Sequence, residues 1–153
     1  SGDFAGKRVL FVGYGEQAEM LNEKINDLDL SDCCYYLGPK THRELSELYN
    51  QADIMIFPTM LYESLGLVGI EAMACGCPVI GSDIGCLPEY IKEGITGFLF
   101  EPGNSHELAE RIVDFYKLTE KQRNTMRLEA IRYVDKYESR KISQALINKI
   151  KEI

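Results

Sequence analysis

Short apolar runs alternate along the chain with longer stretches in which apolar residues recur at helical spacing. The apolar runs predict five strands, over residues 7–13, 33–37, 52–57, 78–81 and 98–100. Helices are predicted over 16–28, after Thr41, and over 64–75, 87–93, 106–118, 120–136 and 139–153. Short strands alternating with helices predict an α/β fold, a Rossmann-like parallel sheet with helices on both faces. A length of 153 residues fits one domain with a sizeable core.

Local signals mark several of these helix ends. Thr41 is followed three residues later by Glu44, which predicts a capping box at the start of the second helix. Asn104 or Ser105 is expected to cap the helix at 106–118. Gly76 is placed to end the helix at 64–75.

The overall charge restricts the partners. A net charge of -7 argues against a nucleic-acid backbone or an anionic membrane surface as a partner. No apolar run has the length needed to cross a membrane. The sequence therefore predicts no nucleic-acid partner and no membrane span in this chain.

The five cysteines, at positions 33, 34, 75, 77 and 86, are an odd number with poor disulfide spacing. The Cys75-Gly76-Cys77 motif is too short to hold a tetrahedral zinc by itself, and only His42 and His106 could add imidazole ligands. Both histidines stand at helix starts and are predicted to be solvated. Because unpaired cysteine is usually buried, we expect free, reduced, mostly buried thiols in a cytosolic protein, and no metal site.

The stretch from Pro58 to Cys77 is the most unusual part of the chain. Ser64 is the predicted N-cap of a helix that is apolar on nearly every face. All-round apolarity predicts a helix buried between other layers. Glu71 is the one charged residue inside this helix, and Glu63 stands just before its start. A carboxylate in a buried helix is costly unless it has a partner.

The placement of these carboxylates suits a nucleotide. In parallel sheets, ligands bind outside the carboxyl ends of strands, where the loops at 13–15, 38–40, 58–63 and 82–86 should lie. Ser64 and Glu71 are roughly 10 Å apart along a helix axis, about the distance from the phosphates to the sugar of a nucleotide. The amides of Gly66 and Leu67 could receive a diphosphate, and Glu71 could bind two ribose hydroxyls. On spacing alone, a buried ion pair for Glu71 and a solvated Glu63 fit equally well.

Two other nucleotide-binding patterns are incomplete. Gly13-Tyr14-Gly15 is half of a dinucleotide fingerprint, but Ala18 takes the place of the third glycine and no acidic residue ends a second strand at the expected distance. No lysine of the P-loop type follows a glycine loop, which excludes a P-loop enzyme.

Glu63 and Glu71 form an E-x7-E arrangement inside Glu-Ser-Leu-Gly-Leu-Val-Gly-Ile-Glu-Ala-Met-Ala-Cys-Gly-Cys-Pro-Val-Ile. This segment closely resembles the signature of retaining, GT-B-fold glycosyltransferases of the glycogen-synthase-like group, glycosyltransferase family 4. The similarity extends in the family's order through 9–15, 35–38, 48–53, 85–89 and 94–99. It covers nearly all of the chain.

The resemblance implies roles for individual residues. Glu71 would hold the ribose hydroxyls, and Ser64, Leu65, Gly66 and Leu67 would meet the diphosphate and the donor sugar. Glu63, the expected catalytic residue, would contact the donor sugar, and the loop near Lys40 would meet the base through main-chain groups. The implied reaction is metal-independent transfer of a hexosyl group from a nucleoside-diphosphate sugar to a glycan, lipid or other acceptor, with retained anomeric configuration.

The resemblance also implies a domain organisation. Residues 1–153 would be the C-terminal, donor-binding domain of a GT-B enzyme, without its first strand and helix and the Arg and Lys that these carry. Residues 137–153 would form a crossover helix toward an absent N-terminal acceptor-binding domain. Cys86 departs from the family, which often has a second glycine there, and leaves the shape of its loop open. The isolated chain is expected to be inactive or nearly so.

Two other functions remain open. One is the half-site of a different GT-B enzyme, such as a nucleotide-sugar epimerase or phosphorylase. The other is a non-catalytic docking module, which predicts a large exposed apolar patch. The expected location is the cytoplasm, with peripheral membrane attachment of the full-length protein left open.

Overall fold

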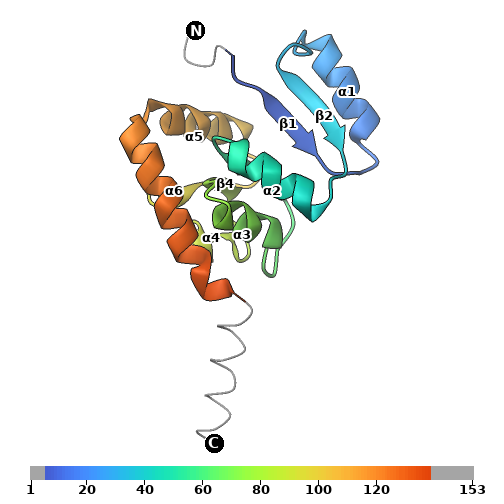
Figure 1. Ribbon diagram of the computed structural model, residues 1–153. Coiled ribbons are helices and arrows are strands. Elements are labelled where there is room, and N and C mark those ends of the chain that lie inside the picture. Colours follow the sequence, from blue (N-terminus) through green and yellow to red (C-terminus); the bar gives the residue numbers. More distant parts are fainter. Residues whose placement is uncertain (1–5, 139–153) are drawn as a thin grey trace, which may run out of the picture. The chain divides into compact units, whose positions relative to one another are not determined.

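The computed structural model describes residues 6–138 and divides the chain into two compact units, Ser1–Leu45 and Ser46–Ile153 (Figure 1). The first unit contains β1 (Val9–Val12), α1 (Ala18–Asp27), β2 (Cys34–Gly38) and the start of α2 (His42–Gln51). The second contains β3 (Met55–Phe57), α3 (Leu67–Ala74), β4 (Val79–Ser82), α4 (Leu87–Tyr90), β5 (Gly97–Phe100), α5 (Ser105–Lys117), α6 (Glu120–Val134) and a 3-10 turn over Asp135–Tyr137.

The first unit is a small parallel strand pair. β1 pairs with β2 so that Val9 lies opposite Cys34, and the register shifts after Phe11. The phenol of Tyr36 in β2 donates to the carbonyl oxygen of Gly13, the residue after β1, at 2.9 Å. Most of the side chains on β1 are exposed, and the buried apolar residue of α1 is Ile25.

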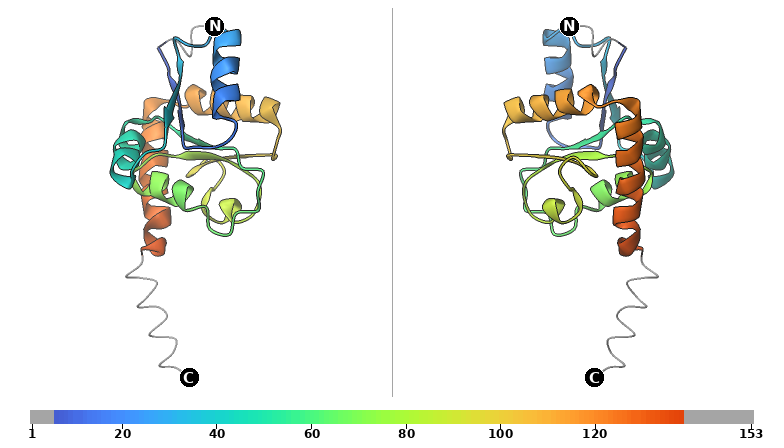
Figure 2. Two further views of the ribbon diagram at one scale, coloured as in Figure 1. Left: turned by 90° about the vertical axis from the view of Figure 1, so that its right-hand side faces the viewer. Right: turned by 90° about the vertical axis from the view of Figure 1, so that its left-hand side faces the viewer.

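The second unit contains a parallel sheet in the order β3-β4-β5. All four residues of β4 are buried, so β4 is the centre of this unit. Because side chains alternate across a strand, Val79 and Ile80 point to opposite faces. Val79 packs in one core cluster with α3, α4 and α6, whereas Ile80 packs in another with Phe115 of α5. Figure 2 shows α5 on one side of this sheet and α3 and α4 on the other.

The prediction of an α/β, Rossmann-like fold with parallel strands and helices on both faces is confirmed. The expected single sheet appears instead as two sheets, a pair and a trio, since the described strands form no ladder between β1–β2 and β3–β5. The predicted helix over 139–153, and nearly all of the predicted crossover helix over 137–153, lie outside the described residues. Within residues 6–138, no helix combines the length and apolarity needed to cross a membrane.

The helix-end predictions at Thr41, Asn104 and Gly76 are confirmed. Glu44 and Thr41 exchange hydrogen bonds between side chain and main chain, at 2.8 and 3.3 Å. The side chain of Asn104 accepts from the amide of Glu107 at 3.0 Å. Gly76, with φ of 74°, ends α3, and the amides of Gly76 and Cys77 donate back to the last turn in a Schellman motif.

The cysteine prediction is partly wrong. All five cysteines are free, as expected. Cys77 and Cys86 are buried, whereas Cys33, Cys34 and Cys75 are partly exposed. The first two of these precede or begin β2 in the small unit, which buries few of its side chains.

Candidate functional site

The segment between β3 and α3 contains most of the predicted site residues. Phe57 ends β3, and α3 begins only at Leu67, so Glu63, Ser64 and Leu65 belong to a loop. Gly66 precedes the helix with φ of 59° and ψ of 50°, a left-handed conformation that favours glycine. The prediction that Ser64 caps the helix is therefore wrong, because Gly66 occupies the cap position and no side chain caps α3.

The amino end of α3 has backbone amides that can donate hydrogen bonds to a ligand. The first amides of any α-helix lack a partner within the helix, and here these belong to Leu67 and Val68. The helix dipole adds partial positive charge at this end, on the order of half an elementary charge. A phosphate oxygen is the kind of group that such a terminus binds.

The helix is buried on one face and not on all. Gly69, Ile70, Ala72 and Met73 are buried, whereas Leu67 is 58% exposed and Val68 is also exposed. The prediction of a helix buried between layers on every side is therefore wrong. The loop before it also exposes large apolar side chains, with Tyr62 at 83%. These residues form an apolar rim around the start of α3, made of Met60, Leu61, Tyr62, Leu65, Leu67 and Val68.

Glu71 lies on α3, one helical turn after Leu67, and is partly buried. It forms part of the wall of a hollow of about 380 Å³ between α3, α6 and the turn after α6. Burial, together with the negative charge of Glu71, raises the pKa of the nearby Tyr49 phenol to about 12. The carboxylate thus stands at the edge of the core, where its charge acts on neighbouring groups.

The loop after β4 holds the loop that contains Glu63. The amide of Cys86 donates to the carbonyl oxygen of Glu63 at 3.1 Å. Gly85 has φ of 61°, and a Cβ at this position would lie 2.5 Å from the same carbonyl oxygen. Cys86 itself has φ of -83°, an ordinary right-handed conformation, so this loop does not require the second glycine that is frequent in the family.

Tyr90 of α4 completes this contact between the two loops. Its hydroxyl donates to the carbonyl oxygen of Gly66 at 3.2 Å, and its side chain is fully buried. The sequence analysis missed Gly85, Cys86 and Tyr90 as supports of the site. The available signal was their place in the loop and short helix that follow β4, which does not reveal the partner.

Lys40 belongs to the first unit. It follows β2 and forms an ion pair with Glu44 at 3.8 Å, next to the capping box of α2. Hydrogen bonds from Thr41 lower the pKa of Glu44, and the charge of Lys40 adds to this effect. The structure thus groups Glu63, Ser64, Leu65, Gly66, Leu67 and Glu71 in one unit and places Lys40 in the other.

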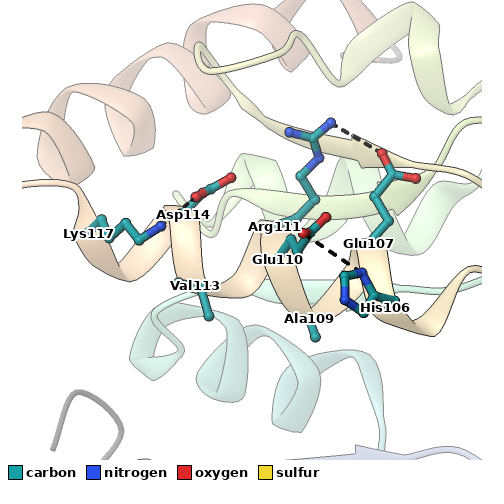
Figure 3. Close-up of a pocket in the computed structure, with 8 residues that line it drawn as sticks. All are labelled: His106, Glu107, Ala109, Glu110, Arg111, Val113, Asp114 and Lys117. Carbon is teal, nitrogen blue, oxygen red and sulfur yellow. Dashed lines mark hydrogen bonds and ion pairs between the residues drawn. The ribbon is translucent and has the colours of Figure 1, made fainter. Parts of the chain in front are cut away.

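A second hollow, of about 440 Å³, runs along the surface of α5 (Figure 3). Its walls come from α5 alone, and its charged side chains pair along the helix, such as Arg111 with Glu107 at 3.2 Å. His106 is exposed, as predicted, and lies 3.8 Å from Glu110. Among the described residues, no three His, Cys, Asp or Glu side chains gather in a way that could hold a metal ion.

The family model described as "Glycosyl transferases group 1" matches residues 5–132. The chain belongs to this family. It is 35% identical over 117 residues to the N-acetyl-alpha-D-glucosaminyl L-malate synthase of Bacillus anthracis, which covers 76% of this chain and 30% of that protein. It is 36% identical over 112 residues to the D-inositol 3-phosphate glycosyltransferase of Mycobacteroides abscessus, covering 70% of this chain and 25% of that one.

Several solved structures of GT-B glycosyltransferases are similar to this chain. Anabaena HepE in complex with UDP superposes with a TM-score of 0.85 at 27% identity, over 96% of this chain and 41% of that one. Sucrose-phosphate synthase from Thermosynechococcus elongatus gives a TM-score of 0.79 at 26% identity, over 93% of this chain and 38% of that one. This group 1 chain therefore spans less than half the length of the relatives that it matches.

Proposed function

We propose that this chain is the donor-binding domain of a retaining, family 4 glycosyltransferase, which transfers a hexosyl group from a nucleoside-diphosphate sugar to a glycan, lipid or other acceptor. The observation that carries the proposal is the junction at Gly66. There a left-handed glycine ends the loop with Glu63, the first amides of α3 lack partners within the helix, and Glu71 follows one turn later. The UDP complexes of HepE support a nucleotide donor.

Each residue has a physical role in this proposal. The amides of Gly66 and Leu67 receive the diphosphate, and Ser64 and Leu65 lie against the phosphates and the donor sugar. Glu71 accepts hydrogen bonds from the ribose hydroxyls, because an ionised carboxylate is an acceptor with two oxygens. Glu63, as the catalytic contact, meets the donor sugar, and the main chain near Lys40 meets the base. Because amides and a helix dipole stabilise the leaving phosphate, no metal ion is required.

The strand orders support the proposed truncation. The doubly wound order 3-2-1-4-5-6, without its first strand, leaves a pair 3-2 and a trio 4-5-6. The chain has a pair, β1-β2, and a trio, β3-β4-β5. We therefore propose that the full-length protein supplies a preceding strand and helix, with the Arg and Lys that neutralise the diphosphate, and an N-terminal acceptor-binding domain that residues 137–153 approach. Without these parts the chain binds nucleotide weakly and does not catalyse the transfer. The complete enzyme acts in the cytoplasm.

Titration of UDP into the 153-residue chain, followed by NMR, tests this proposal. We expect binding in the millimolar range or tighter. Glu71→Gln removes the charge but keeps the shape, and Glu110→Gln is the matched control on the exposed surface of α5. Since a hydrogen bond to a charged group contributes about 1.5–3 kcal/mol, E71Q should weaken UDP binding roughly 10-fold or more, and E110Q should not.

A second ligand isolates the ribose contact. The 2′-deoxy analogue of UDP lacks one of the two hydroxyls assigned to Glu71. The wild-type chain should therefore prefer UDP to 2′-deoxy-UDP, and this preference should disappear in E71Q. Equal affinities of the wild type and E71Q for UDP would show that the ribose assignment is wrong.

The apolar rim around the start of α3 favours a second candidate, a docking module. A docking module would bind a protein through Met60, Leu61 and Tyr62 and would not bind UDP. The same titration separates the two functions, because a chain without any UDP binding contradicts the donor-binding proposal. An epimerase or phosphorylase with the same half-site is distinguished by the products of the full-length protein.

A further inference from the structure

Tyr90 is a buried aromatic residue with an unusual polar contact. Its side chain has no exposed surface and packs in the core cluster of α3, α4 and α6. A buried tyrosine hydroxyl usually finds a hydrogen-bond partner. Here the partner lies 24 residues away in sequence, the carbonyl oxygen of Gly66 at 3.2 Å.

The hydroxyl of Tyr90 fills the space next to the first turn of α3. A Cβ at Gly66 would lie 2.7 Å from Tyr90 Oη, and a Cβ at Gly69 would lie 2.6 Å from the same atom. Glycine at both positions therefore leaves room for this oxygen. The carbonyl oxygen of Gly66 also accepts from the amide of Gly69 at 2.9 Å, the first turn of the helix.

A planar peptide group couples the hydrogen bond of Tyr90 to the orientation of the Leu67 amide. The carbonyl of Gly66 and the amide of Leu67 belong to the same trans peptide unit, so the C=O and N–H bonds point in opposite directions. A hydrogen bond that fixes the carbonyl toward Tyr90 therefore fixes the direction of the Leu67 N–H. Two donors on one carbonyl also polarise the peptide group, which strengthens the N–H as a donor.

We propose that the Tyr90 hydroxyl is a positioning group for the donor diphosphate: through the Gly66 carbonyl it sets the direction of the Leu67 amide, the first of α3. The inference rests on the proposed function, in which the amide of Leu67 is one of the two that receive the diphosphate. Tyr90 is not a catalytic residue, because it acts through Gly66. Burial raises the pKa of its phenol, and electrostatic interactions with Cys86 and Glu63 add to the shift, so the hydroxyl stays a donor at physiological pH.

The test compares Tyr90→Phe with Tyr116→Phe in the 153-residue chain. Both variants lose one hydroxyl from the same unit and keep the ring. The Tyr116 hydroxyl donates to Asp53 Oδ2 at 3.2 Å and lies outside the loop between β3 and α3. The probe is UDP, and the measurements are its dissociation constant and the amide resonances of Leu67 and Val68 in the ligand-free chain.

We expect Y90F to weaken UDP binding about 3–10-fold, the effect of one neutral hydrogen bond, and to shift both amide resonances. Y116F should change neither of these, although the thermal midpoints of the two variants should fall by similar amounts. A purely structural role for Tyr90 predicts the same UDP affinity in both variants, and that result would overturn the inference.

A second variant perturbs the hydroxyl without deleting it. Gly69→Ala places a Cβ against Tyr90 Oη, while alanine is about 1 kcal/mol more favourable than glycine inside a helix and helps the chain to fold. G69A should therefore change UDP affinity and the Leu67 amide in the same direction as Y90F. Unchanged Leu67 and Val68 resonances in Y90F and G69A would refute the positioning itself, whereas a wild-type chain that binds no UDP would refute the proposed function.

Discussion

Gly85 offers the sharpest test of how the β4–α4 loop supports the site. Its φ of 61° disfavours any other residue, and a Cβ would lie 2.5 Å from the carbonyl oxygen and 2.8 Å from the amide nitrogen of Glu63. Both are main-chain atoms, so an alanine cannot be accommodated by rotation of a side chain. In Gly85→Ala the loop with Glu63 must move away, and the hydrogen bond from the Cys86 amide to Glu63 is stretched or lost.

Gly94 provides the matched control. Its φ of 70° is nearly the same, but no atom lies within 4 Å of a Cβ at this position. Gly94→Ala therefore carries only the cost of a left-handed alanine, about 1–2 kcal/mol. Gly85→Ala carries the same cost and two more. The shift of the loop that relieves the clash costs about 1–3 kcal/mol, and the weakened hydrogen bond costs about 0.5–1.5 kcal/mol.

The difference is measurable by thermal unfolding. For a domain of this size, 1 kcal/mol corresponds to about 2–4 °C in Tm, so G85A should melt about 3–18 °C below G94A. UDP titration should also show weaker binding in G85A, because Glu63 and the start of α3 share the displaced loop. Equal Tm values and equal UDP affinities for the two variants would refute the contact between the β4–α4 loop and Glu63.

Three further predictions concern stability and reactivity. Thr119→Ala should lower the stability by about 1 kcal/mol, because it removes the capping box in which the Thr119 hydroxyl accepts from the Gln122 amide at 3.3 Å; Thr119→Ser should restore the loss in a urea titration. Burial raises the pKa of the Cys77 thiol to about 12, so roughly one thiolate in 10⁴ is present at pH 8. Iodoacetamide should therefore label Cys75 well before Cys77 in the folded chain, as peptide mass spectrometry can show, and similar rates would contradict the burial of Cys77. In the unfolded chain the Cys77 thiol has a pKa near 9, so between about pH 9 and 12 it ionises in the unfolded chain but not in the folded one. The free energy of unfolding should therefore fall as the pH rises through this range.

The features that the sequence predicted well are local. The capping box at Thr41 and the end of α3 at Gly76 depend on residues a few positions apart, and both were located correctly. The start of α3 was predicted three residues too early, because Ser64 has the chemistry of a cap. What decides the start is the left-handed conformation of Gly66 beside Tyr90, a contact across 24 residues that no local pattern contains.

The composition of α3 also did not predict which of its faces are exposed. An apolar sequence does not distinguish a helix covered on all faces from one that presents an apolar face beside a loop, as α3 does at Leu67 and Val68. For Glu63 and Glu71, spacing alone left a structural role and a ligand role equally open. The resemblance to glycosyltransferases provided the assignment, and family membership is now shown, although the individual roles remain predictions.

The loop at Glu63 is held through its main chain: the carbonyl oxygen accepts from Cys86, and the glycine at position 85 lies against the backbone. Such contacts do not depend on which side chain position 63 or its neighbours carry. During divergence, residues 60–65 can therefore exchange in size and polarity while the backbone that presents them keeps its path. A single substitution in this segment can therefore change the chemistry presented beside the start of α3 without a change in the scaffold that carries it.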